Sequence, residues 1–434
     1  MKKVLIITYY WPPSGGAGVQ RWLKLIKYLR IYGWEAVVYT PENPEAPSLD
    51  NSLMKDIPED LKIIKTKIWE PYTAYKTFIG KKDQAINAGF LSETKKPRFS
   101  ENIAVWIRGN LFIPDARKFW IKPSIKYLVK YLAKNPVNAI VSTGPPHSMH
   151  MIALGIKKKL SIPWLADFRD PWTNIDFYDQ LKLSVRADKL HRKKEKEVIL
   201  AANKIVTVNL NMAKEFEEMG AKNTAVVSNG FDEDDYSFDK ISLSKEFSIV
   251  HLGSINKDRN PTALWEALKE LLSEIESFKN DLKIIFIGKT DFSVIESINQ
   301  NKLAAYTKNF HYLPHTEALE ETAKAQILLL PLNNTPNAPG ITTGKIFEYL
   351  AIKRPILCIG PSNGDCARIL NETNSGKVAD FGDKMKIKSI LENYYELYKN
   401  KDLFVESKGL QKFSRKNLAG EIAGLLDSIT SVSE

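Results

Sequence analysis

The sequence contains little cysteine and lacks any long apolar run. Among its 434 residues there are two cysteines, Cys358 and Cys366, with neither a CxxC pair nor a nearby histidine. A disulfide framework or a zinc site is therefore not expected, and a reducing cytoplasm is the expected compartment. The most apolar stretch, residues 327–332, has the length of a strand and not of the ~20 residues that span a bilayer.

The N-terminus lacks the signature of a secretion signal. Met1-Lys2-Lys3 resembles the basic start of such a signal, but the apolar run that follows is short. It leads into Pro12-Pro13 and Gly15-Gly16 without a cleavage site of small residues. A buried parallel strand over residues 4–8 explains this apolar run better than a secretion signal does.

Acidic residues are fewer than basic residues in this sequence. Sixty-two Lys and Arg residues stand against 51 Asp and Glu, which gives a formal net charge of +11. This balance favours anionic partners, namely nucleic acid, an acidic membrane face or phosphorylated small molecules, although lysines that are merely solvated explain it as well. The hydrophobic content of 44% and the length indicate a globular protein of two domains.

Short apolar strands alternate with amphipathic helices from the N-terminus onward. A helix over 19–32 ends at Gly33 and leads into a strand over 36–40, which completes a βαβ unit. Further strands are predicted at 139–142, 164–166, 205–208, 225–227, 249–252, 283–287, 327–330 and 356–359. The pattern predicts an α/β fold with doubly wound parallel sheets.

The expected domain boundary is the turn and acidic run that follow residue 228. We expect a Rossmann-like N-terminal domain over 1–228, a hinge over 229–246 and a second Rossmann-like domain over 247–410, the two facing each other across a cleft. Residues 411–434 form a C-terminal helix that is amphipathic enough to pack back on the first domain.

Residues 69–123 interrupt the alternation and read as an insertion rich in lysine and aromatic residues. Basic residues interleaved with Trp, Phe and Tyr suit a membrane interface. A helical insertion whose aromatic residues are partly buried explains the same composition, and both interpretations stay open.

The first glycine-rich loop contains Gly15, Gly16 and Gly18 between a strand and a helix. The glycine spacing does not match GxGxxG, and the second strand ends at Thr40-Pro41 without an acidic residue, so a dinucleotide site is disfavoured. The free N–H groups at the start of the helix suit a phosphate. A tight strand–helix turn is the competing explanation.

A second loop, GITTGK, precedes the helix that contains Glu348. It is not a P-loop, because its spacing is too short and Ile346 stands where a Ser or Thr is required. Backbone amides near Thr343 and Gly344 would nevertheless point at an anion, and Lys345 adds a positive charge. Glu348 lies one helical turn further and could accept both hydroxyls of a ribose, or form a surface ion pair with Lys345.

Two further loops follow predicted strands. Gly253 and Ser254 end one strand, and Arg259 comes shortly before the next helix, where it could meet the same diphosphate. In the first domain, Arg169 and Asp170 follow a strand, where ligands gather in open α/β sheets. Asp170 could orient an acceptor hydroxyl, and Arg169 could bind a phosphate or bridge the carboxylates of Asp167 and Asp170.

The order of these motifs resembles a retaining glycosyltransferase of the family 4 type with the two-domain GT-B fold. The resemblance is carried by the strand–PPSGGAGVQRW–helix start, the VSNGFD hinge, the LGSxxxxxR loop, and GKIFEYLAIKRPIL after ILLLPL. It covers nearly the whole chain and is weakest over 69–123. It implies a nucleotide sugar held mainly by the second domain and an acceptor held mainly by the first.

The resemblance also assigns roles to individual residues. It implies that Gly15 and Gly16 approach the donor phosphate, with Gly253, Ser254, Thr343 and Gly344 around the donor. The ribose-binding glutamate falls on Glu348, the basic residue of the second-domain loop falls on Arg259, and Lys345 matches a lysine of some members.

Three departures from the family pattern stand out. Gly340 replaces a second glutamate that many members carry. Ser254 stands where many have arginine, which places more of the diphosphate neutralisation on Arg259 and Lys345. The first-domain histidine of the family falls near Thr143, and His147, four residues on, either substitutes for it or merely starts a helix.

The sequence therefore predicts a hexosyltransferase-like enzyme that acts without a metal or other cofactor. Catalytic roles fall to Arg259, Lys345, Asp170 and His147. The expected partners are a nucleoside diphosphate sugar, a glycan or lipid-linked acceptor of cell-surface polysaccharide synthesis and an anionic membrane surface, with no nucleic acid. The expected location is the cytoplasm, peripheral at the inner membrane face. The alternatives are a sugar-nucleotide epimerase or hydrolase on the same fold, and a non-catalytic basic protein that binds nucleic acid or membrane.

Overall fold

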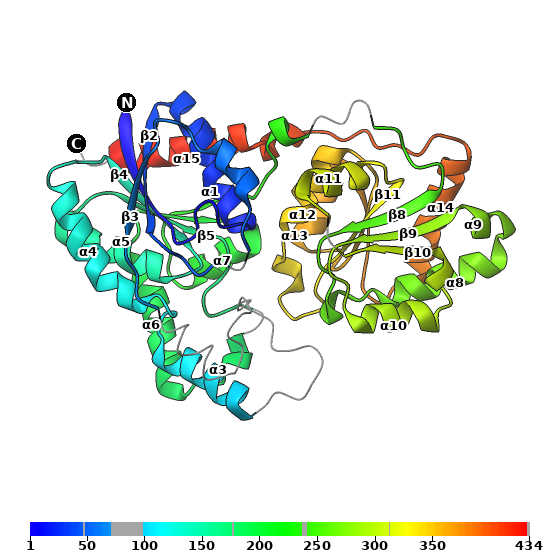
Figure 1. Ribbon diagram of the computed structural model, residues 1–434, viewed down its shortest axis with the longest axis horizontal. Coiled ribbons are helices and arrows are strands. Elements are labelled where there is room, and N and C mark those ends of the chain that lie inside the picture. The colour runs from blue at the N-terminus through cyan, green and yellow to red at the C-terminus, as the bar shows by residue number, and fades with distance from the viewer. Residues whose placement is uncertain (47, 71–98, 176–177, 237–240, 312, 432–434) are drawn as a thin grey trace. The chain divides into compact units, whose positions relative to one another are not determined.

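The structure is a computed structural model that describes residues 1–46, 48–70, 99–175, 178–236, 241–311 and 313–431. Part of the insertion expected over 69–123, part of the hinge expected over 229–246 and the last three residues lie outside this description. The chain divides into two compact units, Met1–Asn229 with Arg415–Glu434, and Gly230–Ser414. Each unit is a parallel sheet with helices on both faces (Figure 1).

The described residues of the first unit form a seven-stranded sheet in the order β3-β2-β1-β4-β5-β6-β7, with every pair parallel. Its strands are β1 Lys2–Ile7, β2 Trp34–Pro41, β3 Lys62–Thr66, β4 Ala139–Gly144, β5 Trp164–Phe168, β6 Lys204–Thr207 and β7 Thr224–Val226. The strand order reverses between β1 and β4, which is the switch point at which open α/β sheets bind ligands.

Helices cover both faces of this sheet because its central strands are apolar on both sides. Leu5 and Ile7 of β1 belong to one buried cluster, whereas Val4 and Ile6 belong to the cluster on the opposite face. The helices are α1 Ala17–Leu29, α3 Phe99–Leu111, α4 Lys118–Leu132, α5 Ser148–Leu160, α6 Val185–Ala201, α7 Leu210–Glu218 and α15 Arg415–Thr430. Short 3-10 turns are η1 Arg30–Tyr32, η2 Asn51–Asp56 and η3 Tyr178–Leu181.

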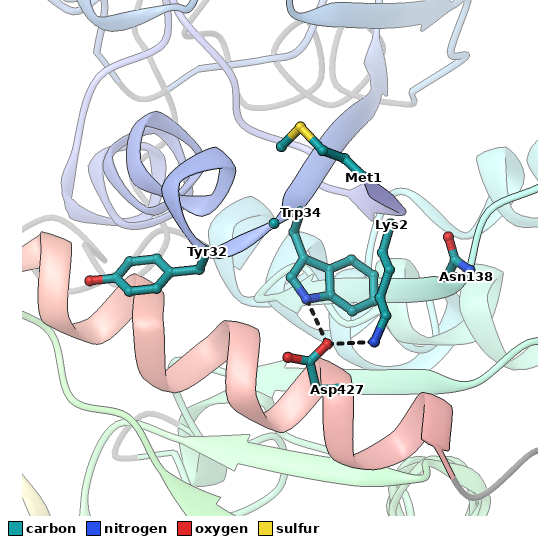
Figure 2. Close-up of a pocket in the computed structure, with 7 residues that line it drawn as sticks. Met1, Lys2, Tyr32, Trp34, Asn138 and Asp427 are labelled. Atoms are coloured by element: carbon teal, nitrogen blue, oxygen red, sulfur yellow. Dashed lines mark hydrogen bonds and ion pairs between the residues drawn. The ribbon is translucent and has the colours of Figure 1, made fainter.

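The C-terminal helix α15 packs beside α1, although the two are far apart in the sequence (Figure 1). Asp427 of α15 accepts hydrogen bonds from Lys2 Nζ at 2.8 Å and Trp34 Nε1 at 3.2 Å (Figure 2). The hollow of about 530 Å³ beside these residues lies at the N-terminal ends of β1 and β2. Ligands of open α/β sheets bind at the opposite, carboxyl ends, so this hollow is not the candidate site.

The second unit repeats the same strand order in the six-stranded sheet of its described residues, β10-β9-β8-β11-β12-β13, again fully parallel. The strands are β8 Phe247–Leu252, β9 Leu282–Ile287, β10 Thr307–Phe310, β11 Ile327–Pro331, β12 Ile356–Ile359 and β13 Gly376–Ala379. Its switch point lies between β8 and β11.

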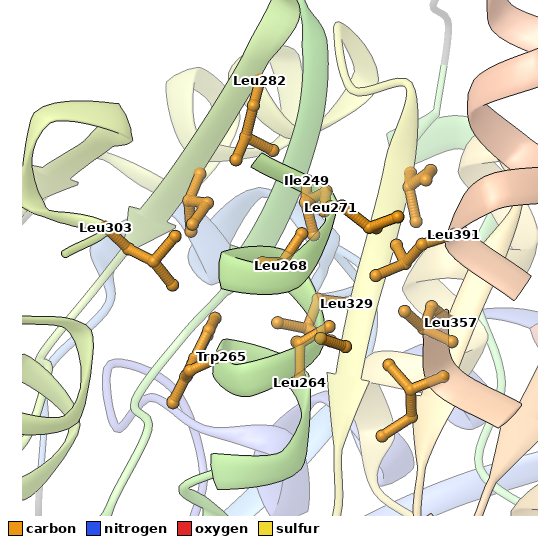
Figure 3. Packing of buried hydrophobic residues seen from close by; sticks show 14 of the residues in the cluster. Ile249, Leu264, Trp265, Leu268, Leu271, Leu282, Leu303, Leu329, Leu357 and Leu391 are labelled. Atoms are coloured by element: carbon orange, nitrogen blue, oxygen red, sulfur yellow. The ribbon is translucent and has the colours of Figure 1, made fainter. Parts of the chain in front are cut away.

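One face of this second sheet is covered by α8 and α14. Leu264, Leu268 and Leu271 of α8 interdigitate with Ile249 of β8 and Leu329 of β11 in a fully buried cluster (Figure 3). The helices are α8 Thr262–Glu274, α9 Glu276–Asp281, α10 Phe292–Gln300, α11 His315–Ala323, α12 Gly344–Ile352, α13 Asp365–Thr373 and α14 Lys384–Lys399. Short 3-10 turns are η4 Glu233–Asp235, η5 Lys257–Arg259, η6 Ala304–Tyr306, η7 Ala338–Gly340 and η8 Leu410–Phe413.

The predicted fold class, two Rossmann-like parallel-sheet units, is confirmed. The sequence pattern missed β3, β10 and β13, all of which lie at sheet edges. Edge strands need only partial burial, so KIIKT, TKNF and GKVA mix polar residues into the pattern and lose the apolar run that marks a central strand.

Two expectations drawn from composition can be compared with the structure. Cys358 and Cys366 are both buried and free. None of the described helices combines the length and the apolar character needed to cross a bilayer.

Candidate functional site

In each unit, polar loops gather at the carboxyl ends of the strands that flank the switch point. In the first unit these are the loops after β1, β4 and β5. In the second unit they are the loop after β8 and the segment between β11 and α12. Almost all of the site residues predicted from the sequence lie in these loops or in the first turns of the helices that follow.

In the second unit, Lys345 lies directly against the Gly253–Ser254 turn. Its Nζ donates to the Ser254 carbonyl at 3.4 Å. A Cβ added to Gly253 would come within 2.5 Å of Lys345 Cε, and Gly253 has a φ of 93°, so both space and backbone conformation require glycine there. Five predicted residues, Gly253, Ser254, Thr343, Gly344 and Lys345, are thus brought together.

The start of α12 is capped by a side chain that the sequence also singled out. Thr343 is the N-cap residue, and its hydroxyl accepts a hydrogen bond from the Lys345 backbone N–H at 3.1 Å. The buried Thr342 hydroxyl has no hydrogen-bond partner among the described residues. A helix start with free donors is a favourable place for an anion.

A second cation converges on the same turn. Arg259 of η5 donates from Nε to Asn333 Oδ1 at 2.7 Å and from Nη1 to the Ser254 carbonyl at 3.4 Å. Burial, and then the positive charge of Arg259, lower the pKa of Lys345 to about 7, while the carboxylate of Glu348 opposes that shift. Two cations crowded at one helix start indicate a site that is electrostatically completed by an anion.

Glu348 lies one turn along α12 from Lys345 and is partly buried. Its charge acts on the Lys345 amine, so the carboxylate belongs to the same cluster. This placement is compatible with the ribose role that the sequence predicts, in which the helix start holds the diphosphate and the carboxylate accepts hydrogen bonds from the ribose hydroxyls.

Sequence reasoning missed His251, which lies buried at the end of β8 beside this cluster. His251 Nδ1 donates to the Leu329 carbonyl at 3.0 Å, and Nε2 has no partner among the described residues. Burial, together with the positive charges of Lys345 and Arg259, lowers the pKa of His251 to about 3, so the ring is neutral at pH 7. A histidine within an apolar strand carries no sequence signal that separates it from a core residue.

In the first unit the glycines of the loop after β1 have different surroundings. Gly15 donates its N–H to the Ser48 carbonyl at 2.9 Å, and a Cβ there would come within 2.9 Å of Ser48 Oγ. Gly16 has a φ of 103° and open space beside it. A Cβ at Gly18 would come within 1.6 Å of Arg169 Nη1. The loop is therefore packed on its neighbours at Gly15 and Gly18 and open at Gly16.

The buried Asp167 carboxylate is occupied by hydrogen bonds within the protein. It accepts hydrogen bonds from Arg21 Nη2 at 2.8 Å, Trp22 Nε1 at 2.7 Å and Thr143 Oγ1 at 2.8 Å. Arg21 also donates to the carbonyls of Val227 at 2.9 Å and Ser228 at 2.8 Å. The ion-pair partner of Asp167 is Arg21, which the sequence did not single out. Arg169, for which the sequence left open a phosphate-binding role and a bridge between carboxylates, donates to the Pro145 carbonyl.

His147, Asp170 and Gly15 line one cavity of about 360 Å³ in the first unit, together with Arg169. The His147 ring stacks on Trp172 with a centroid separation of 4.7 Å and an interplanar angle of 2°. Burial lowers the pKa of His147 well below its usual range, so the ring is neutral at pH 7. Gly15, His147 and Asp170 thus share one site in this unit, whereas the remaining predicted residues except Gly16 form the cluster in the second unit.

Among the residues that the structure describes, no cluster of His, Cys, Asp or Glu side chains could hold a metal ion. The acidic run after the predicted boundary does not form one: Asp232 is buried and caps η4 through Asp234 N.

No protein-family model matches the chain, and no curated protein matches it by sequence. Solved structures match its fold over nearly the whole length. One is a glycosyltransferase from Rickettsia africae (TM-score 0.62, 14% identity, 99% of this chain and 98% of that chain). A second is Anabaena HepE in complex with UDP-glucose (TM-score 0.54, 12% identity, 100% and 98%).

A third similar structure is a Listeria monocytogenes protein assigned as a UDP-N-acetylglucosamine 2-epimerase (TM-score 0.55, 10% identity, 100% and 97%). At these identities the likeness establishes the fold, which is of the GT-B type. Proteins named as a glycosyltransferase and as a sugar-nucleotide epimerase therefore both have a fold similar to that of this chain.

Proposed function

We propose that the protein is a retaining glycosyltransferase of the family 4 type that takes its sugar from a nucleoside diphosphate sugar. The observation that carries the proposal is the convergence of Lys345 and Arg259 on the Ser254 carbonyl at the start of α12. Glu348, one turn further, supplies a carboxylate for the ribose hydroxyls. The resemblance of the sequence motifs to that family supports the assignment.

The charges in this cluster suit the chemistry of the donor. Cleavage of the bond between the anomeric carbon and the diphosphate oxygen leaves the electron pair on the diphosphate and positive charge on the sugar. Lys345, Arg259 and the N–H groups at the start of α12 stabilise the departing diphosphate. We propose that these groups perform the neutralisation that a divalent metal performs elsewhere, so that the enzyme acts without a metal.

The acceptor side belongs to the first unit in this proposal. Asp170 orients the attacking hydroxyl of a glycan or lipid-linked acceptor, and the neutral ring of His147 forms part of the wall beside it. Gly16, which has open space beside it, leaves room for the donor phosphate. The family resemblance supports these roles.

We further propose that the enzyme acts in cell-surface polysaccharide synthesis as a peripheral protein of the inner membrane face. Trp69 and Phe119 are 63% and 42% exposed, and Lys118 lies over the Phe119 ring. Exposed aromatic rings beside lysines suit the headgroup region of an anionic membrane. Co-sedimentation with anionic vesicles tests this part: Lys118→Glu combined with Phe119→Ser should abolish binding, and unchanged binding would contradict it.

The second candidate function is a sugar-nucleotide epimerase or hydrolase, favoured by the likeness to the Listeria structure. Nuclear magnetic resonance of the sugar after incubation with nucleotide sugars separates the transferase from the epimerase. A transferase releases or transfers the sugar with its anomeric configuration retained, whereas an epimerase returns a nucleotide sugar inverted at a ring carbon.

A thermal-shift panel tests whether the site binds nucleotides at all. Nucleoside diphosphates at moderate salt should raise the melting temperature selectively, because they bind the folded state. A non-catalytic basic protein would instead respond to any polyanion, heparin included, and lose that response with added salt. Equal stabilisation by heparin and by every nucleotide would overturn the proposed function.

A further inference from the structure

We infer that the cavity of the first unit is the acceptor site and that its ligand is amphiphilic, an apolar group joined to a phosphate-type anion. The identification of this ligand as the acceptor depends on the proposed function. The chemistry of the ligand does not, since it follows from the cavity walls alone.

The cavity is a pocket of the size and character that small ligands occupy. Its volume of about 360 Å³ falls at the lower end of the range of about 300–1,000 Å³ typical of ligand pockets. Much of its wall is apolar. The apolar lining comes from Val19, Phe112, Pro114, Trp172, Ile175 and Leu181.

One side of this wall is fixed by hydrogen bonds that tie three segments together. Trp172 Nε1 donates to His191 Nδ1 at 3.1 Å, and His191 Nε2 donates to the Gly109 carbonyl at 3.2 Å. Glu195 accepts from the Trp172 and Thr173 backbone N–H groups, both at 3.3 Å. The loop after β5 is thus anchored to α6 and to α3, and these hydrogen bonds hold this side of the cavity wall in place.

The polar part of the cavity is centred on Arg169. Its Nη2 donates to the Pro145 carbonyl and its Nη1 lies against Gly18, whereas its buried Nε has no hydrogen-bond partner among the described residues. The neighbouring His147 is 8% exposed, and its buried Nδ1 also lacks a partner there. A buried guanidinium donor without an acceptor is costly, and an anionic oxygen in the cavity would satisfy it.

Two other charged side chains of the lining already have partners within the protein. Arg117 Nε pairs with Glu70 at 3.1 Å, and Asp115 accepts from the Ser148 backbone N–H and hydroxyl, both at 2.8 Å. Asp170 lies near Arg169 and favours its charged form. Arg108 also lines the cavity, so a ligand anion would meet two cations, Arg169 and Arg108. Asp170 lies beside Arg169, where it can orient a neutral hydroxyl.

A line of aromatic rings leads from the cavity wall to the protein surface. Phe112 lines the cavity and contacts Phe119 at 6.1 Å between centroids, and Phe119 contacts Trp69 at 4.8 Å. Lys118 lies over the rings of both Phe112 and Phe119. We call Trp69, Phe112, Lys118 and Phe119 the aromatic–basic patch. It suits the headgroup region of a bilayer, from which a lipid-borne phosphate would reach the cavity along an apolar path.

Two lipid classes share this chemistry, single-chain isoprenyl phosphates and two-chain phospholipids. Isothermal titration of the full chain with farnesyl phosphate, farnesol, inorganic phosphate and a short-chain phosphatidylglycerol distinguishes them. Farnesyl phosphate should bind at least tenfold more tightly than farnesol or inorganic phosphate if the ligand is an isoprenyl phosphate. Preference for phosphatidylglycerol over all three supports the phospholipid form. Binding of farnesol as tight as that of either lipid would overturn the inference, as would the absence of lipid binding.

Two variants and one control locate the binding. Arg169→Met should bind farnesyl phosphate no more tightly than farnesol, while its affinity for farnesol is unchanged. Ile175→Trp should lower the affinity for farnesyl phosphate and for phosphatidylglycerol at least tenfold, because the larger side chain fills the cavity. Ile175 lies in a loop and is partly exposed, so this second variant remains informative if Arg169→Met fails to fold. Arg186→Met, an exposed arginine on α6 of the same unit that does not line the cavity, is the matched control and should behave as the wild type. Wild-type affinity in both cavity variants would overturn the inference.

The same samples separate this inference from the proposed function. Nucleotide-sugar binding depends on the second unit and is measured in a parallel titration. Donor binding without lipid binding overturns the lipid inference alone. Lipid binding without donor binding leaves the amphiphilic ligand of the cavity standing, but it overturns the transferase and with it the identification of that ligand as the acceptor.

Discussion

Gly18 and Arg169 lie in direct contact: a Cβ on Gly18 would come within 1.6 Å of the Arg169 guanidinium. The glycine-rich loop of this chain therefore makes room for a protein cation at Gly18, in addition to any space that it leaves for a ligand. This relationship connects the loop after β1 with the loop after β5 and fixes the position of Arg169 in the cavity.

Gly18→Ala should displace Arg169 and lower kcat/KM for glycosyl transfer by about 10- to 100-fold, the scale expected for a misplacement of about 1 Å. Gly18 does not adopt a left-handed φ, so no backbone strain is added, but the overlap with Arg169 should lower the free energy of unfolding by about 1–3 kcal/mol. Steady-state kinetics and a melting curve measure both effects. Gly424→Ala, in α15 of the same unit with open space beside it, is the control and should keep full activity. Normal kcat/KM in Gly18→Ala would contradict the placement of Arg169.

The affinity for nucleotide sugars should depend on pH through Lys345. An anion binds the charged amine, and the pKa of Lys345 is lowered to about 7, so the amine loses its charge as the pH rises through 7. The association constant should fall about tenfold between pH 6 and pH 8, as the charged fraction falls. His251, with a pKa of about 3, stays neutral over this interval and does not contribute.

Titration calorimetry at three pH values measures this dependence. The two phosphates of a nucleotide sugar are diesters and do not titrate near neutrality, so the ligand does not obscure the result. Lys345→Met should bind weakly with a flat pH profile. Lys377→Met, an exposed lysine on the edge strand β13, should retain the wild-type profile. The same pH slope in Lys345→Met would show that another group titrates.

Glu348→Gln should weaken nucleotide binding by about 10- to 100-fold, because it replaces charge-assisted hydrogen bonds to the ribose that contribute about 1.5–3 kcal/mol. Titrations with ribose and deoxyribose nucleotides form a double-mutant cycle. The wild type should discriminate between the two sugars, and the variant should not. Glu266→Gln, an exposed glutamate on α8, is the control. Undiminished discrimination in Glu348→Gln would remove the carboxylate from the ribose site.

Arg21→Met should destabilise the first unit by about 3–5 kcal/mol, because it leaves the fully buried Asp167 carboxylate without its cation. The exposed pair Arg30–Asp60 offers the contrast: Arg30→Met should cost less than about 1 kcal/mol. Chemical denaturation followed by tryptophan fluorescence compares the two variants. Equal stability of both would mean that the buried network contributes little to this unit.

The sequence predicts the parts of this fold whose signals are local. Central strands such as β1 and β8 are apolar on both faces and stand out as short hydrophobic runs, whereas the edge strands β3, β10 and β13 carry polar residues and do not. An edge strand forms because of its pairing with a neighbouring strand, and the pattern of residues along the chain does not show that pairing.

The residues of the candidate site also fall into two groups, those with a local sequence signal and those without one. Thr343, Gly344 and Lys345 are recognisable because a helix start has a local signature, and Glu348 follows from its spacing. The pairing of Arg21 with Asp167 joins residues 146 positions apart, and His251 resembles a core residue in its strand. Both depend on tertiary contacts, so residue types and spacing alone could not reveal them.

Slow hydrolysis of the donor in the absence of acceptor tests the central claim most directly. A panel of nucleotide sugars is incubated with the enzyme in the presence of a chelator, and the released sugar is followed by nuclear magnetic resonance. One donor should yield a nucleoside diphosphate and a sugar that first appears with the anomeric configuration of the donor. Lys345→Met should cleave it about 100- to 1,000-fold more slowly. Loss of cleavage with the chelator and its return with manganese, or equal cleavage by Lys345→Met, would contradict the account.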